Sequence, residues 1–85
     1  MTLQQARLTG QITDSDIRLL RIFRTVVTCS GFSAAEVDLG MSVAAISMAI
    51  ADLEKRVGIR LCQRGRAGFS LTEQGAQVYD AALQL

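Results

Sequence analysis

The sequence predicts a mainly α-helical fold, a winged helix-turn-helix with a three-helix core, a two-stranded β-hairpin wing and the start of a carboxy-terminal linker helix. Two segments carry apolar residues at helical spacing, and a short segment with its own helix-start signal lies between them. Glycines end these three segments, at Gly31, Gly40 and Gly58. Behind Gly58 the apolar period shortens to that of strands, which predicts the hairpin. With 85 residues, 49% of them hydrophobic, the chain suits one small domain.

The first helix is expected over residues 14–30, after a flexible arm over residues 1–13. Asp14 and Asp16 favour its amino end, because acidic side chains there meet the positive end of the helix dipole. Gly31 is expected to end it, since glycine adopts the left-handed conformation without strain. The apolar stripe of this helix consists of Ile17, Leu20, Phe23 and Val27.

A short second helix is expected to begin at Ser33. Ser33 and Glu36 have the spacing of a capping box, in which each side chain accepts the other residue's backbone N–H. Phe32 and Val37 have the spacing of a hydrophobic staple across the same turn. Gly40 would end this helix after two turns, too early for it to be stable without packing against a neighbour.

A longer third helix is expected to follow at once, capped by Ser42 and ended by Gly58. Its buried stripe is Ile46, Ile50, Leu53 and Val57. Its opposite side, the outer face, carries uncharged and mostly small side chains: Val43, Ala44, Ser47, Met48 and Ala51. A short and a long helix joined by a glycine turn form a helix-turn-helix, whose second member can lie in the DNA major groove.

The segments "IRLCQR" and "FSLT", joined by "GRAG", predict the hairpin. Net charge is only +1, but the charged residues from 55 to 66 are all basic: Lys55, Arg56, Arg60, Arg64 and Arg66. Arg64 and Arg66 on the hairpin would bind phosphates or enter the minor groove. The open amino ends of the second and third helices, at Ser33 and Ser42, would offer further N–H groups to phosphate.

A last helix is expected to be capped by Thr72. Residues 14–72 then form the winged domain, and residues 73–85 form the truncated start of a linker or dimerisation helix. The apolar residues that this helix would offer to a second copy are Ala76, Tyr79, Ala82 and Leu83.

Composition argues against several other classes of function. The chain has no histidine, no pair of acids placed in a cleft and no glycine-rich phosphate loop, so an enzyme is not expected. Cys29 and Cys62 lack the spacing of a zinc site and are expected to be reduced structural thiols. No apolar run reaches the length of a membrane span, and the polar start lacks the apolar centre of a signal peptide. A cytoplasmic, nucleoid-associated protein is expected.

The order of these elements resembles the DNA-binding domain of LysR-type transcriptional regulators over about Asp16 to Gly75. The most specific pieces are the run S-x-x-A-I-S-x-x-I-x-x-L-E from Ser42 to Glu54, and "GIRLCQR" followed by "FSLTEQG". The resemblance implies sequence-specific binding to double-stranded promoter or operator DNA and a homodimer, or higher homo-oligomer, formed through the last helix. It also implies a small-molecule effector bound by a domain absent from this sequence, and no cofactor in this domain.

The family's functional positions carry over onto eight residues. Its base-facing positions fall on Val43, Ala44, Ser47 and Met48, and its phosphate-contacting positions on Ser33, Ser42 and Arg64, with Arg66 added at the wing tip.

The outer face departs from the family's pattern, which often has glutamine at Val43, proline or serine at Ala44, and a basic or polar pair at Met48 and Ala49, whereas all four residues are apolar here. This shifts the expected recognition from bidentate hydrogen bonds to methyl contacts, DNA shape and the wing. Glu36 stands where a small alanine is usual, and would be accommodated by folding back as the capping-box partner of Ser33.

Three alternatives remain at this point. A winged helix can serve as a protein–protein interaction module, which the near-neutral charge and apolar outer face favour. The molybdate-responsive regulators share a related winged helix, although the run from Ser42 to Glu54 fits them less well. An enzyme is the weakest alternative, because no catalytic group is apparent.

Overall fold

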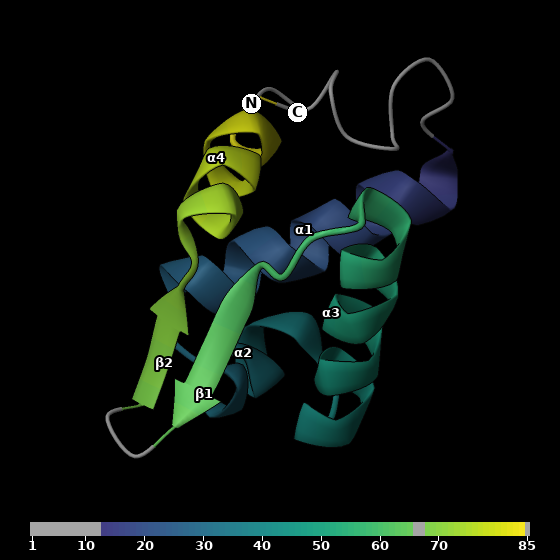
Figure 1. Ribbon diagram of the computed structural model, residues 1–85. Coiled ribbons are helices and arrows are strands. Elements are labelled where there is room, and N and C mark those ends of the chain that lie inside the picture. The colour runs from purple at the N-terminus through teal and green to yellow at the C-terminus, as the bar shows by residue number, and fades with distance from the viewer. Residues whose placement is uncertain (1–12, 66–67, 85) are drawn as a thin grey trace.

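The computed structural model describes residues 13–65 and 68–84, which form four helices and one antiparallel two-stranded sheet (Figure 1). In chain order the elements are α1 (Asp14–Thr28), α2 (Phe32–Leu39), α3 (Val43–Val57), β1 (Cys62–Gly65), β2 (Gly68–Leu71) and α4 (Glu73–Ala82). The winged helix-turn-helix fold is therefore confirmed. Residues 1–12 of the predicted arm lie outside the described residues.

Helix α1 begins at a capping box that the sequence reading missed. The backbone N–H of Thr13 donates to Asp16 Oδ2 over 3.0 Å, and the N–H of Asp16 donates to Thr13 Oγ1 over 3.2 Å. Thr13 is thus part of the folded domain and not of an arm. Asp16 is fully buried and also forms an ion pair with Arg56 in the last turn of α3. The start of α1 is therefore fixed to the end of α3.

The end of α1 is a Schellman motif, with the left-handed residue one position earlier than expected. Ser30 has φ 61°, and its N–H donates to the carbonyl of Val27 over 3.0 Å. The N–H of Gly31 donates to the carbonyl of Val26 over 3.0 Å, and Gly31 itself is extended. The prediction that Gly31 is the left-handed stop is wrong, because the extended chain at Gly31 already leads into α2.

The predicted start of α2 is also wrong. The helix begins at Phe32 with Gly31 as its N-cap, and no side chain caps it. Ser33 is therefore the second residue of the helix. Phe32 is buried whereas Val37 is 88% exposed, so these two side chains do not form a staple. Burial of the Phe32 ring starts the helix at that residue and places Ser33 on the outside.

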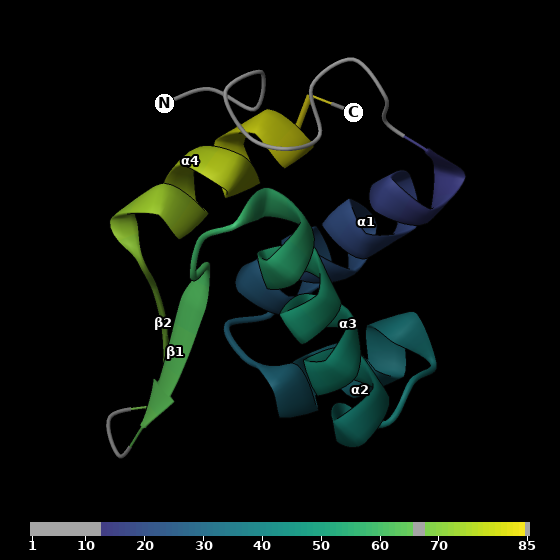
Figure 2. The ribbon, with the colours of Figure 1, turned by 45° about the vertical axis from the view of Figure 1, so that its right-hand side comes forward.

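The turn between α2 and α3 has the expected form. Gly40 adopts the left-handed conformation with φ 63°, and the helix axis changes direction by 101° between the two helices (Figure 2). Gly58 ends α3 in the same conformation, with φ 76°. Within residues 13–65 and 68–84, each helix is by itself too short or too polar to span a bilayer, and only the bent pair of α2 and α3 has the required length and apolar composition.

The hydrophobic core lies between α1 and α3 and extends to α4 and to the segment before β1. The predicted stripe of α3 is fully confirmed, since its four residues are all buried. In α1 the buried stripe is shifted, because Ile17 and Val27 are only half-buried. The largest fully buried apolar side chains are Phe23, Leu20, Ile46, Leu53, Leu61 and Val26.

The buried face of α4 differs from the predicted stripe. Gly75, Val78 and Ala82 are buried against the rest of the domain. Ala82 is therefore not available to a second copy, which corrects its assignment to a dimerisation surface. Ala76 and Leu83 are exposed, and Tyr79 is half-buried with its hydroxyl 3.2 Å from that of Thr28.

Candidate nucleic-acid interface

The outer face of α3 is open at its centre. Ala44, Met48 and Ala51 are exposed, and Met48 is 70% accessible despite its apolar side chain. Val43 is half-buried. None of these side chains is charged, so the face can approach a surface closely without removing a charge from water.

Ser47 lies on the outer face but turns partly inward. The residue is half-buried, and among the described residues its Oγ, which is buried, has no hydrogen-bond partner. Ser47 lines a hollow of about 190 Å³ between α3 and β1, next to Phe32 and Gln63. The serine expected on an exposed helix face therefore faces the wing more than the solvent.

The amino end of α3 is closed. Ser42 Oγ accepts from the N–H of Ala45 over 3.1 Å, as the predicted cap requires. In addition, Glu36 Oε2 accepts from the N–H of Val43 over 3.0 Å. Glu36 is thus not the capping-box partner of Ser33, because it reaches across the turn to the next helix. The expectation of an open helix end at Ser42 is wrong for two of its donors.

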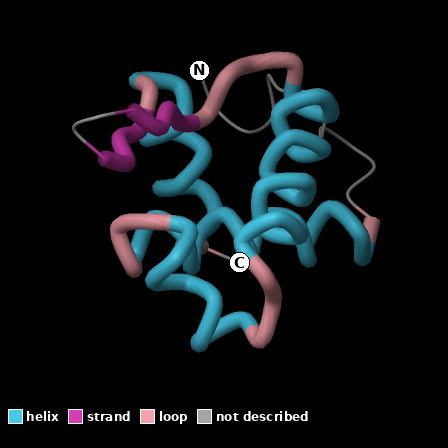
Figure 3. Tube along the Cα trace, turned by 90° about the horizontal axis from the view of Figure 1, so that it is seen from below, coloured by secondary structure: helices cyan, strands magenta, loops and turns pink. Residues whose placement is uncertain are grey.

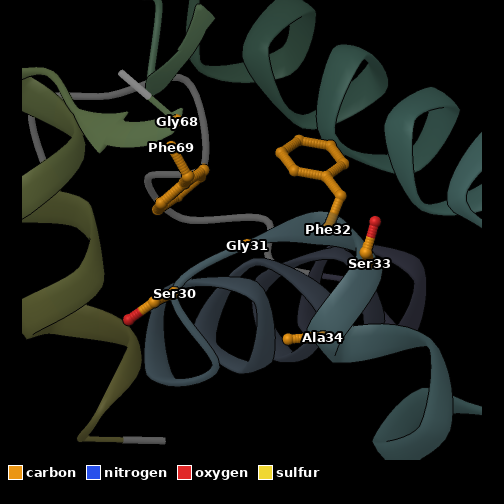
Figure 4. Close-up of a pocket in the computed structure, with 7 residues that line it drawn as sticks. All are labelled: Ser30, Gly31, Phe32, Ser33, Ala34, Gly68 and Phe69. Carbon is orange, nitrogen blue, oxygen red and sulfur yellow. The ribbon is translucent and has the colours of Figure 1, made fainter. Parts of the chain in front are cut away.

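The amino end of α2 lacks a side-chain cap, and exposed Ser33 lies in its first turn. This end borders a hollow of about 370 Å³ whose far side is formed by the wing. Figure 4 shows Phe32 and Phe69 among the residues that line it. The rings of these two residues meet edge to face, with centroids 5.9 Å apart and planes at 61°, so they pack the wing against α2.

The wing is a regular hairpin in which Arg64 on β1 pairs with Phe69 on β2. Gly68 has φ 100° at the start of β2, a conformation that favours glycine. Arg66 lies outside the described residues. Figures 1 and 2 place the amino end of α3 and the far ends of both strands at the bottom of the molecule, with α4 at the top. Seen from below, the strands stand beside the helices (Figure 3).

The segment before the wing is fastened on both sides. Leu61 donates its backbone N–H to Glu54 Oε2 over 2.8 Å, and its carbonyl accepts from the N–H of Thr72 over 3.1 Å. Thr72 Oγ1 donates to the carbonyl of Arg60 and accepts from the N–H of Gly75. The end of α3, the hairpin and the start of α4 therefore share one hydrogen-bonded junction.

A family model described as "Bacterial regulatory helix-turn-helix protein, lysR family" matches residues 17–76. The match covers the helix-turn-helix, the wing and the start of α4. The chain belongs to the LysR family. Among the proteins to which the chain is similar is the HTH-type transcriptional activator BauR of Pseudomonas aeruginosa, which is 63% identical over 76 residues. That alignment covers 89% of this chain and 25% of BauR, so the chain spans about a quarter of the length of this relative.

Two crystal structures with DNA have the same fold. The BenM_DBD/benA site 1 DNA complex matches with a TM-score of 0.75 and 32% identity, over 80% of this chain and 76% of that one. The CbnR_DBD-DNA complex matches with a TM-score of 0.75 and 28% identity, over 80% of this chain and 78% of that one. The winged helix-turn-helix of this LysR-family chain is thus the fold of two domains that were crystallised with DNA.

Sequence reasoning missed two features of this region. The spacing with Ser33 predicts that Glu36 caps the start of α2, whereas its carboxylate accepts from the N–H of Val43 at the start of α3. The ion pair between Asp16 and Arg56 carried no local signal, because its partners are 40 residues apart in the chain (56 − 16).

Proposed function

We propose that this chain binds double-stranded DNA in a sequence-specific manner, as the DNA-binding domain of a LysR-type transcriptional regulator. The observation that carries the proposal is the exposed, uncharged outer face of α3, whose amino end lies on the same side of the molecule as the far ends of the wing strands. In this arrangement α3 enters the major groove while the wing meets the backbone or the minor groove. The two DNA complexes of related fold support it.

Base recognition is assigned to the exposed part of α3. Ala44 and Met48 would contact thymine methyl groups, with Val43 at the edge of the contact. Ser47 keeps the base-facing position that the family's pattern gives it, but it must turn its hydroxyl out of the hollow beside β1 to donate a hydrogen bond. Most of the free energy that discriminates between sequences is therefore assigned to apolar contacts and to DNA shape.

Backbone contacts are assigned to the residues around this face. Ser33 lies at the uncapped end of α2, and a phosphate oxygen there would accept from the helix N–H groups. Ser42 is exposed at the start of α3, where its hydroxyl, which accepts from the N–H of Ala45, would donate to a phosphate oxygen. Arg64 on β1 would supply a cation that neutralises phosphate charge, and the same role is assigned to Arg66, which lies outside the described residues.

The remaining properties concern the whole regulator. We expect a homodimer through α4, with exposed Ala76 and Leu83 in the contact and Tyr79 at its edge. A second domain would bind the small-molecule effector, and this domain needs no cofactor and performs no catalysis. The regulator would act in the cytoplasm, at the nucleoid.

The experiment selects duplexes from a random-sequence pool with this chain and measures affinity for a selected duplex and for its scrambled version over a range of salt concentrations. The proposal predicts tighter binding to the selected duplex, and a log affinity that falls with log salt by about 0.9 per phosphate neutralised. A near-neutral charge and an apolar face would also suit a protein partner. Absence of duplex binding, or a flat salt response, would favour that second function.

A further inference from the structure

Glu36 accepts most of the backbone hydrogen bonds in the turn of the helix-turn-helix. Its backbone carbonyl accepts from the N–H of Gly40 over 2.8 Å and from the N–H of Met41 over 3.3 Å. Its carboxylate accepts from the N–H of Val43 over 3.0 Å. Three of the four backbone N–H groups from Gly40 to Val43 therefore donate to Glu36. An alanine there would keep the carbonyl contacts and lose the one that reaches α3.

The carboxylate also lies at a charged place in the proposed complex. The amino end of a helix carries a partial positive charge and unsatisfied N–H donors, which attract phosphate. The negatively charged carboxylate of Glu36 accepts from the first backbone N–H donor of α3, that of Val43. The side chain of Glu36 is half-buried, so this charge is only partly screened by water. The phosphates of a DNA backbone that approaches α3 are therefore repelled by this carboxylate, whereas the amino ends of most helices attract phosphate.

We infer that Glu36 is a positioning residue for DNA recognition and that it has two separable effects. This inference rests on the proposed function and deepens it. The hydrogen bond between Glu36 and Val43 fixes the direction of α3 relative to α2, and so sets the discrimination between sequences. The negative charge of Glu36 lowers the affinity for all duplexes by a similar factor. The chain thereby limits nonspecific binding through the residue that also aims its recognition helix.

Two substitutions separate these effects. Glu36→Gln keeps an oxygen acceptor for the Val43 N–H and removes the charge. It should bind both the selected and the scrambled duplex more tightly, by about threefold to tenfold at low salt, with a gain that shrinks as salt rises. Glu36→Ala removes the acceptor as well. It should reduce the ratio of the two affinities by about fivefold or more, because α3 loses its fixed direction.

Asp38→Asn is the matched control, since it removes one negative charge from the same helix. Asp38 is exposed and accepts from the Cys29 thiol over 3.5 Å, at the end of α1 and not at α3. It should change affinity by less than about twofold. A gain in Asp38→Asn equal to that in Glu36→Gln would show an effect of net charge alone and would overturn the assignment to Glu36.

Fluorescence anisotropy with both duplexes, together with thermal unfolding of each variant, gives the result. Glu36→Gln that unfolds like the native chain but binds no tighter overturns the effect of charge. Glu36→Ala with an unchanged affinity ratio overturns the positioning effect, and Glu36→Gln should restore that ratio if the acceptor matters. A native chain that binds no duplex would instead overturn the proposed function, and this inference with it.

Discussion

The backbone N–H of Leu61 donates to the carboxylate of Glu54 over 2.8 Å, which fastens the wing to the last turn but one of α3. The N–H of Cys62 lies 3.5 Å from the same oxygen. Because the carbonyl of Leu61 also accepts from Thr72, the base of the hairpin is held from both sides. The carboxylate of Glu54 is therefore the contact that ties the base of the wing to α3.

Substitution of Glu54 tests this contact. Glu54→Ala leaves the N–H of a buried residue without an acceptor, which should lower the free energy of unfolding by about 1 to 3 kcal/mol. Glu54→Gln keeps an acceptor oxygen and should lose less than half as much. Urea denaturation measures both losses, and equal losses would argue against the hydrogen bond as their cause.

Gly75 tests the close contact between α4 and the base of the wing. A Cβ on Gly75 would lie 1.8 Å from the carbonyl oxygen of Leu61, so a backbone must move. Gly75→Ala should destabilise the fold by about 1 to 3 kcal/mol, although alanine is the better helix former. Thermal unfolding of Gly75→Ala at or above the native midpoint would contradict the contact.

The ion pair between Asp16 and Arg56 makes a prediction for pH. The Arg56 guanidinium beside Asp16, and then the hydrogen bonds between Asp16 and Thr13, hold the pKa of Asp16 below the usual 3.8. A lowered carboxyl pKa contributes stability above the unfolded-state value, and this contribution disappears as the pH falls through the lower folded value.

Asp16→Asn should therefore be less stable than the native chain at neutral pH, by about 1 to 2 kcal/mol. The loss is limited to this size because the Arg56 side chain stays partly in water, which screens the ion pair. The difference should be constant from pH 7 to about 5 and should shrink below pH 3.8. Urea denaturation at several pH values measures it. A stability difference between the native chain and Asp16→Asn that grows as the pH falls would contradict this account of the ion pair.

Arg64 tests the assignment of the wing to the DNA backbone. Arg64→Ala should weaken binding to selected and scrambled duplexes by similar factors and reduce the salt slope by about one unit. Anisotropy titrations at several salt concentrations measure the slope. An unchanged slope would remove Arg64 from the set of phosphate contacts, and a loss confined to one sequence would give it a role in base recognition.

Most of the architecture was predictable because its signals are local. Helical periodicity found the α3 stripe, and the glycines at positions 40 and 58 marked helix ends that require a left-handed residue. The change of period found the hairpin. These features depend on a few consecutive residues, so the sequence alone contains them.

The errors arose where tertiary contacts decide between similar local patterns. Ser33 and Glu36 have the spacing of a capping box, but burial of Phe32 started α2 earlier and left Glu36 free to reach Val43. In α4, apolar periodicity indicated a stripe at Ala76, Tyr79 and Leu83. The close contact of Gly75 with Leu61 instead turns the neighbouring face, with Ala82, inward. Apolar periodicity predicts which residues share a face of a helix, but it does not predict which face packs against the rest of the domain.

The central claim, that the outer face of α3 contacts bases, is tested most directly at Met48. Met48 is 70% exposed, so Met48→Glu should leave the stability of the domain within about 0.5 kcal/mol of native. Gln77→Glu on the exposed side of α4 adds the same charge as a control. Anisotropy titration of the selected duplex should show binding about tenfold to hundredfold weaker for Met48→Glu, and nearly native for Gln77→Glu. Native affinity in a folded Met48→Glu variant would contradict the claim.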